Sequence, residues 1–129
     1  MFKTLIVDDN ASFRHSFKEH LYQHAPGIDV VEAGSVSDAM AKFAETSPDL
    51  VFIDIDLAGE SGLELTKEIA SIQGDTVIAI LTNYDLLEYR NAAKHFGANH
   101  FFSKGASSMD EVLALVDTVV FEKQRQGDI

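Results

Sequence analysis

The sequence predicts an α/β fold in which one parallel sheet of five strands carries helices on both faces. Short apolar runs alternate along the chain with segments whose apolar residues recur at helical spacing, which gives five strand–helix units in a row. The first, third and fourth runs are almost continuously apolar. Such runs are typical of strands that are buried on both faces of a parallel sheet.

The five predicted strands are short and apolar and are separated by turn-forming residues. They are "KTLIV" (3–7), "IDVVEA" (28–33), "LVFID" (50–54), "TVIAIL" (76–81) and "HFFS" (100–103). Asp9 or Asn10 can cap the helix that follows the first strand. Site-forming loops of such sheets lie at the carboxyl ends of the strands, so these ends are the place to look for function.

Apolar stripes predict the helices between the strands. The first three stripes are Phe13, Phe17 and Leu21; Val36, Ala39, Met40 and Phe43; and Leu65, Ile69 and Ile72. A weaker period predicts a helix over 85–96. The last helix opens with Ser108-x-x-Glu111, the spacing of a capping box, and continues through Val112, Leu113, Val116 and Val120.

The length and composition predict one globular domain, and they argue against nucleic-acid binding, disulfides and thiolate metal sites. A chain of 129 residues suffices for one core, which we expect at 1–121, with a polar tail or the start of a linker at 122–129. The net charge of −11 argues against nucleic-acid binding. The absence of cysteine excludes disulfides and thiolate metal sites and is compatible with a cytoplasmic location. We expect no membrane association, because no apolar run reaches spanning length and no signal peptide is present.

Polar residues follow four of the predicted strands at the carboxyl edge of the sheet. These residues are Asp8-Asp9 after the first strand, Asp54 at the end of the third, Thr82 after the fourth and Lys104 after the fifth. Each alone has an ordinary explanation, as a helix cap, a β-forming residue or a solvated lysine. Their expected meeting at one edge instead favours a functional site.

Three clustered carboxylates need a cation. Two carboxylates about 4 Å apart repel by about 4 kcal/mol at an effective dielectric constant of roughly 20. Oxygen ligands without histidine or cysteine suit a hard ion, and Mg²⁺ fits because it combines a few carboxylates with water and phosphate. Lys104 would supply a further positive charge.

Over residues 1–121 the chain resembles a response-regulator receiver domain, the phosphoacceptor domain of two-component signalling. The resemblance lies in "LIVDDN", "DLVFIDIDLAGESGLEL", "VIAILTNYD" and "FGANHFFSKG", in this order and at the spacings of that family. It implies a flavodoxin-like, doubly wound (βα)5 fold with strand order 2-1-3-4-5. It also implies a protein that is a signalling switch rather than an enzyme, apart from its own phosphotransfer and dephosphorylation.

The resemblance assigns roles to the strand-end residues. Asp54 accepts a phosphoryl group from the phosphohistidine of a sensor kinase or a histidine phosphotransfer protein. Mg²⁺ is held by Asp9 directly, by Asp8 through water, by Asp54, and by the backbone carbonyl of Asp56. The phosphoryl oxygens are contacted by Thr82 and Lys104.

Two further roles follow from the resemblance. Thr82 and Phe101 form a switch, in which Thr82 moves toward a phosphoryl oxygen and Phe101 turns into the vacated space. Asp56 and Tyr84 flank the path of the water that hydrolyses the acyl phosphate. We expect a long-lived phosphoryl group, because the bulky Tyr84 hinders this water and Asp56 does little to orient it if its side chain faces away.

The switch would remodel the face formed by residues 85–120, and it could drive self-association or partner docking there. Leu115 and Val119 widen the apolar arc of the last helix beyond the stripe through Val112 and Val116. Two explanations stay open: the arc packs under a neighbouring helix, or it is a docking face.

The sequence departs from the family pattern at two places. Leu57-Ala58 replaces the common Met-Pro after the acceptor, while Gly59 and Gly62 are kept, so we expect the turn to survive. Gly105 replaces the proline that often follows the lysine, which leaves the Lys104–Gly105 peptide open to be cis or trans.

Other functions fit less well. Asp54-Ile55-Asp56 also resembles the nucleophile motif of haloacid-dehalogenase-type phosphatases, in which the second acid is a general acid/base. That family places the motif on its first strand and its acidic metal pair later, the reverse of this chain.

A flavin or nucleotide module would need a glycine-rich first turn, and "DDNASFR" is acidic. A phosphorylation-independent interaction module would not need the complete set of acids, Thr82 and Lys104. His20 and His24 have helical metal-ligand spacing but no evident third ligand, so we expect a solvated helix face.

Overall fold

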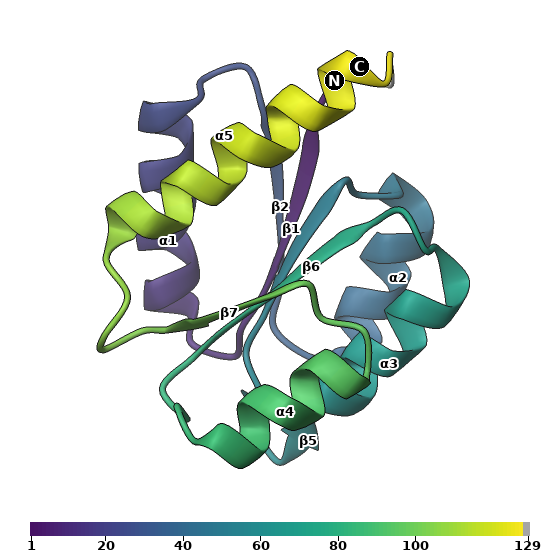
Figure 1. The fold of residues 1–129 in the computed structure, drawn as a ribbon, viewed down its shortest axis with the longest axis vertical. Coiled ribbons are helices and arrows are strands. Elements are labelled where there is room, and N and C mark those ends of the chain that lie inside the picture. Colours follow the sequence, from purple (N-terminus) through teal and green to yellow (C-terminus); the bar gives the residue numbers. More distant parts are fainter. Residues whose placement is uncertain (128–129) are drawn as a thin grey trace.

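The computed structural model describes residues 1–127, and it contains the predicted five-stranded parallel sheet (Figure 1). The strands are β1 (Lys3–Val7), β2 (Asp29–Ala33), β3 (Leu50–Ile53), β6 (Val77–Thr82) and β7 (His100–Ser103). Their order in the sheet is β2-β1-β3-β6-β7, with every neighbouring pair parallel. Numbered among themselves, these strands have the order 2-1-3-4-5, so the predicted flavodoxin-like topology is confirmed.

Five helices cover the two faces of the sheet (Figure 1). They are α1 (Ala11–His24), α2 (Val36–Thr46), α3 (Gly62–Ile72), α4 (Leu87–His95) and α5 (Met109–Arg125). One apolar cluster joins α1 and α5 to the sheet around Phe17, Phe52 and Val116, and a second joins α2, α3 and α4 to the other face. Most residues of the predicted stripes are buried, but Ile72 is 59 % exposed because it is the last residue of α3.

Side-chain caps begin four of the five helices, α1, α2, α3 and α5. The Asn10 side chain accepts a hydrogen bond from the Phe13 backbone N–H at 3.0 Å, so Asn10 caps α1. Ser108 and Glu111 form both hydrogen bonds of the predicted capping box at the start of α5.

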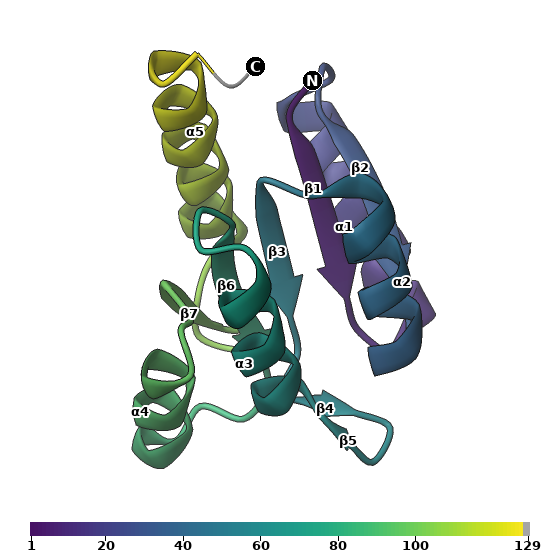
Figure 2. The same cartoon turned by 90° about the vertical axis from the view of Figure 1, so that its right-hand side faces the viewer.

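A small hairpin between β3 and α3 was not predicted. It consists of β4 (Asp56–Leu57) and β5 (Glu60–Ser61), and Figure 2 shows it projecting beyond the carboxyl end of β3. Its two-residue tip has positive φ at both positions, 53° at Ala58 and 91° at Gly59, as a type I′ hairpin turn requires. Ala-Gly is a weak signal for this turn, which favours asparagine or aspartate before glycine. The turn expected from the two retained glycines is therefore present, in the form of a hairpin.

The last helix extends beyond the expected domain end at residue 121. It continues to Arg125, and Lys123 is buried with its Nζ donating to the carbonyl oxygen of Asp75 at 3.0 Å. Part of the segment expected to be a polar tail is therefore helix, while its residues 128 and 129 lie outside the described part of the chain. Within residues 1–127, no helix combines the length and apolar character needed to cross a membrane.

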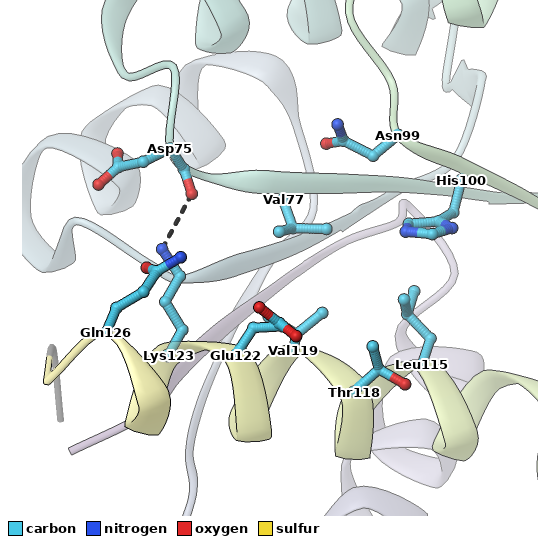
Figure 3. A pocket seen from close by; sticks show the side chains of 10 residues that line it. All are labelled: Asp75, Val77, Asn99, His100, Leu115, Thr118, Val119, Glu122, Lys123 and Gln126. Atoms are coloured by element: carbon cyan, nitrogen blue, oxygen red, sulfur yellow. Dashed lines mark hydrogen bonds between the residues drawn. The ribbon is translucent and has the colours of Figure 1, made fainter.

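The wide apolar arc of α5 is explained by packing. Leu115 and Val119 are 7 % and 5 % exposed and belong to the same core cluster as Val112 and Val116. A groove of about 320 Å³ remains between α5 and the starts of β6 and β7, with Val77 on its floor (Figure 3). Leu115 and Val119 are thus core residues, and they give no support to a docking face.

Candidate functional site

Asp54 lies directly after β3 at the carboxyl edge of the sheet, and donors surround its carboxylate. The residue is 7 % exposed. Its Oδ1 accepts from the Thr82 hydroxyl at 2.6 Å and from the Asp56 backbone N–H at 3.3 Å, and its Oδ2 accepts from Lys104 Nζ at 3.0 Å. The predicted acceptor, threonine and lysine therefore meet, although they come from three different strand ends.

Lys104 connects two acidic residues. Its Nζ lies 2.6 Å from Asp8 Oδ2 and 3.0 Å from Asp54 Oδ2, and its side chain is only 12 % exposed. Burial alone would lower the pKa of Lys104, but the hydrogen bonds to the two carboxylates outweigh burial, and the pKa is raised above its ordinary value. Lys104 is therefore a charged donor held at the acidic cluster.

Phe13 was expected only as part of an apolar helix stripe, but it contacts the lysine. Lys104 Nζ lies 4.1 Å from the centroid of the Phe13 ring, a distance at which the ring face attracts the ammonium group. Phe13 follows the acidic loop by one helical turn. Its spacing could place it on the core side of α1, but nothing in the sequence indicated that α1 would bring it to Lys104.

Asp8, Asp9 and Asp54 form the one group of possible metal ligands found among the described residues. Each offers a carboxylate oxygen, and these oxygens lie within 4.8 Å of one another. Asp8 is 2 % exposed and Asp9 is exposed. Burial raises the pKa of Asp8, although hydrogen bonds from Lys104 and the Asn10 backbone partly oppose it. This all-oxygen donor set fits a hard divalent cation such as Mg²⁺.

The carboxylates line a cleft of about 240 Å³. Its lining is Asp8, Asp9, Asn10, Asp54, Asp56, Asn83, Tyr84 and Lys104. Thr82 lies beneath this surface and is fully buried. Sequence patterns did not single out Asn83, which enters the lining because it follows Thr82 directly.

The second acid of the Asp54-Ile55-Asp56 motif faces a tyrosine. The Asp56 carboxylate is exposed, and the Tyr84 hydroxyl lies 3.4 Å from its Oδ2. The nearby negative charge of Asp56 is the main cause of a raised pKa at Tyr84. Both side chains line the cleft that Asp54 also lines.

Phe101 does not reach Asp54. It lies on β7, pairs with Ile80 of β6, and is partly buried against the second apolar cluster. The Arg90 guanidinium of α4 lies 4.6 Å from its ring centroid. Phe101, the predicted switch residue, thus lies on the edge strand of the sheet. It is two positions before Ser103, which pairs with Thr82.

No peptide bond among residues 1–127 is cis, so the Lys104–Gly105 bond is trans. His20 Nδ1 bonds the carbonyl oxygen of Ser16, and His24 pairs with Asp117 of α5 at 2.8 Å. Neither histidine belongs to a metal-ligand group in the described chain.

Comparisons with known proteins agree with this arrangement. The family model described as "Response regulator receiver domain" matches residues 4–117. The chain is 34 % identical to the DNA-binding transcriptional activator DevR/DosR of Mycobacterium tuberculosis, over 91 % of this chain and 54 % of that protein. It is also 34 % identical to the oxygen regulatory protein NreC of Staphylococcus epidermidis, over 98 % of this chain and 58 % of that protein. The chain thus spans about half the length of these curated relatives.

Solved structures show the same fold. A CheY-like response regulator receiver domain protein from Methanospirillum hungatei superimposes with a TM-score of 0.85 at 22 % identity, covering 97 % of this chain and 98 % of that chain. Chemotaxis protein CheY4 of Vibrio cholerae superimposes with a TM-score of 0.80 at 28 % identity, covering 92 % and 98 %. These comparisons give no support to a haloacid-dehalogenase-type phosphatase. With its family match, strand order and strand-end residues in agreement, the chain belongs to the response-regulator receiver domains.

Proposed function

We propose that this domain is a phosphorylation-dependent switch whose phosphoacceptor is Asp54. The observation that carries the proposal is the environment of one carboxylate: Asp54 is buried between the donors of Thr82 and Lys104 and adjoins Asp8 and Asp9. The donor would be the phosphohistidine of a sensor kinase or of a histidine phosphotransfer protein. The kinase partner is supported by the family to which the chain belongs.

In the transfer, residues of this chain position the phosphoryl group and offset its negative charge. A carboxylate oxygen of Asp54 attacks phosphorus, the phosphorus–nitrogen bond breaks, and its electron pair stays on the imidazole of the donor. The hydroxyl of Thr82 and the ammonium of Lys104, which now bind Asp54 oxygens, can donate to the phosphoryl oxygens instead. Phosphoryl transfer depends mainly on such positioning and on neutralising charge at the equatorial oxygens.

Asp8, Asp9, Asp54 and the backbone carbonyl of Asp56 would hold Mg²⁺. When bound, Mg²⁺ supplies positive charge that offsets the carboxylates and the phosphoryl oxygens. Without a cation, Lys104 is the one cationic side chain among the described residues that pairs with these carboxylates, and it contacts only Asp8 and Asp54. The exposed carboxylate of Asp9 is then the ligand most available to an ion that arrives from solvent.

The output would follow from a rearrangement of Thr82 and Phe101. The rearrangement would change the face formed by α4, β7 and α5, and self-association or partner docking would take place on that face. The contact between Arg90 and Phe101 supports this placement, because a turn of Phe101 would change the exposed surface of α4. The activities named for the longer relatives belong to those proteins, and the cytoplasmic location stays a prediction.

Phosphorylation by a small donor tests the proposal. With Mg²⁺ and acetyl phosphate, intact-mass spectrometry should show one added phosphate that is stable in acid and labile in base. The Asp54→Asn variant should gain none, while Asp56→Asn should still gain it because the side chain of Asp56 is not required. Equal phosphate on Asp54→Asn would refute the assignment, and a requirement for the Asp56 carboxylate would revive the phosphatase alternative.

A further inference from the structure

Arg14 connects the acidic loop of the site to the second strand. Its side chain is 16 % exposed and extends from α1. Nη1 donates to the backbone carbonyl oxygen of Asp8 at 2.5 Å, and Nε donates to Glu32 Oε1 of β2 at 3.1 Å. We propose that Arg14, anchored by Glu32, is a positioning residue for the metal-binding carboxylates, an inference that rests on the proposed function.

The carbonyl that Arg14 binds belongs to the peptide between Asp8 and Asp9. The orientation of this peptide determines where the backbone of Asp9 lies. Asp8 is held independently, because its carboxylate accepts from Lys104 Nζ at 2.6 Å and from the Asn10 backbone N–H at 2.8 Å. The Asp9 carboxylate accepts no hydrogen bond from any residue that the structure describes. Its position therefore depends on the backbone that Arg14 holds.

Glu32 is itself fixed from several sides. Its carboxylate also faces His15 Nδ1 at 3.1 Å and Lys18 Nζ at 3.8 Å, and its backbone carbonyl accepts from Lys42 Nζ. The anchor is only 16 % exposed at its side chain. Arg14 thus ties the loop that follows β1 to a fixed side chain on β2.

Gly34 leaves the space in which the guanidinium lies. A Cβ atom at position 34 would lie 3.3 Å from Arg14 Nη1, and its next nearest atoms also belong to Arg14. The backbone of Gly34 does not require positive φ. A substitution there would consequently act on the guanidinium and leave every charge unchanged.

Electrostatics and positioning predict opposite effects of removing Arg14. Loss of a positive charge near the carboxylates lowers repulsion toward an incoming cation, so charge alone predicts tighter Mg²⁺ binding. Loss of the contact with the Asp8 carbonyl frees the Asp9 backbone, so positioning predicts weaker binding. An arginine that only stabilised the fold would lower the unfolding midpoint without weakening the metal site of the folded protein.

The test is a Mg²⁺ titration of the full chain, followed by the backbone amide signals of Asp9 and Asn10 in NMR spectra. We expect Arg14→Gln to raise the dissociation constant about 10-fold, the scale seen when groups that orient metal ligands are removed. Lys18→Gln is the matched control, because it removes the same charge from the same helix and the same glutamate without touching Asp8. Its affinity should be unchanged or slightly tighter.

Two further variants separate the causes. Arg14→Lys keeps the charge but offers one ammonium in place of a planar fork, so it should also bind Mg²⁺ more weakly. If Arg14→Gln does not fold, Gly34→Ala takes its place and should weaken binding in the same direction.

Two results separate the role of Arg14 from the role of Asp54 as phosphoacceptor. Wild-type binding with equal or tighter binding by folded Arg14→Gln would overturn the positioning role and leave the phosphoacceptor proposal standing. A wild-type chain that binds no Mg²⁺ would overturn both the metal assignment and the role of Arg14.

Discussion

Gly62 lies against the main chain of Asp54, so that a Cβ atom at position 62 would come within 1.9 Å of the Asp54 carbonyl oxygen. It would also lie 3.0 Å from the Cα of Ile55, and neither backbone atom can move without displacing the acceptor. We expect Gly62→Ala to lower the free energy of unfolding by about 1–3 kcal/mol, the usual cost of overpacking. Phosphorylation of Asp54 should fall as well. Urea unfolding and intact-mass spectrometry measure the two effects.

Gly74→Ala is the control for this substitution. Nothing lies within 4 Å of a Cβ atom at position 74, and the backbone there needs no positive φ. The free energy of unfolding should stay the same or rise by about 0.4–1 kcal/mol, because alanine restricts the unfolded chain. If Gly62→Ala were as stable as Gly74→Ala, the close packing behind the acceptor would be wrong.

Removal of Asp9 should separate metal binding from stability. Asp9→Ala takes away an exposed carboxylate that lies within 4.8 Å of its two neighbours. The metal-free variant should melt at a higher temperature than the wild type because repulsion is relieved. It should also lose most of the rise in melting temperature that Mg²⁺ gives the wild type. Glu45→Ala removes the same charge from an exposed position on α2 and should keep the full rise. A wild-type response in Asp9→Ala would show that Asp9 is not a ligand.

His100 should make stability depend on pH. It stands beside the groove between β7 and α5, close to Leu115 (Figure 3), and partial burial lowers its pKa below the ordinary 6.5. Between the lowered value and 6.5 the unfolded chain binds more protons than the folded chain. The contribution of neutral His100 is therefore present above pH 6.5 and is lost as pH falls through the folded pKa.

Melting temperatures at pH 7.5 and pH 5.5 measure this effect. Across this interval, which spans roughly the normal titration of histidine, the wild type should lose more stability than His100→Gln. The two proteins should differ in pH dependence even though their melting temperatures at pH 7.5 are similar. Parallel changes in both would mean that His100 titrates alike in the folded and unfolded chains.

Tyr84 should protect the acyl phosphate. Its side chain lines the same cleft as Asp54, and its hydroxyl lies 3.4 Å from the Asp56 carboxylate, so we expect it to hinder water on the way to the acceptor. Tyr84→Ala should shorten the half-life of the phosphorylated protein several-fold. Tyr89→Ala is the control, since Tyr89 packs edge-on against Tyr84 at 6.1 Å but does not line the cleft. Equal half-lives for wild type and Tyr84→Ala would remove this role.

The strands and the site were predictable from sequence for a shared reason. Buried parallel strands are marked by continuous apolar runs, and their carboxyl ends lie at one edge, so Asp8, Asp54, Thr82 and Lys104 could be expected to meet. The hairpin at Ala58-Gly59 was missed because positive φ at alanine leaves little trace in the sequence.

Contacts between distant elements were also missed. Neither the ring of Phe13 at Lys104 nor the guanidinium of Arg14 at the Asp8 carbonyl follows from any local pattern. For Leu115 and Val119 the sequence pattern was visible, but it did not show what covers these side chains. An apolar arc gives the same pattern whether a neighbouring element or a partner covers it, and only the packing of α5 decided between them.

The hydroxyl of Thr82 lies 2.6 Å from Asp54 Oδ1, and the Thr82 side chain is fully buried. A phosphoryl group on Asp54 would take over this hydroxyl, and Thr82 would move toward it. Phe101, two strand positions before the Thr82–Ser103 pair, could then turn inward and leave Arg90. The contact that it gives up is worth about 0.5–1 kcal/mol at an exposed site, so differential phosphate contacts can exceed it.

NMR spectra with and without beryllofluoride, a mimic of the phosphoryl group, test this relay. In the wild type, shifts should extend from the cleft to the Phe101 ring, the Arg90 side chain and the surface of α4 and α5. Thr82→Ala lacks the hydroxyl and should confine the shifts to the strand-end loops, whereas Thr82→Ser keeps it and should restore them. Both variants should still bind beryllofluoride, because Lys104 and the acidic cluster remain. If the shifts reach residues 85–120 equally in Thr82→Ala, the signal leaves the site by another route and Thr82 is not its carrier.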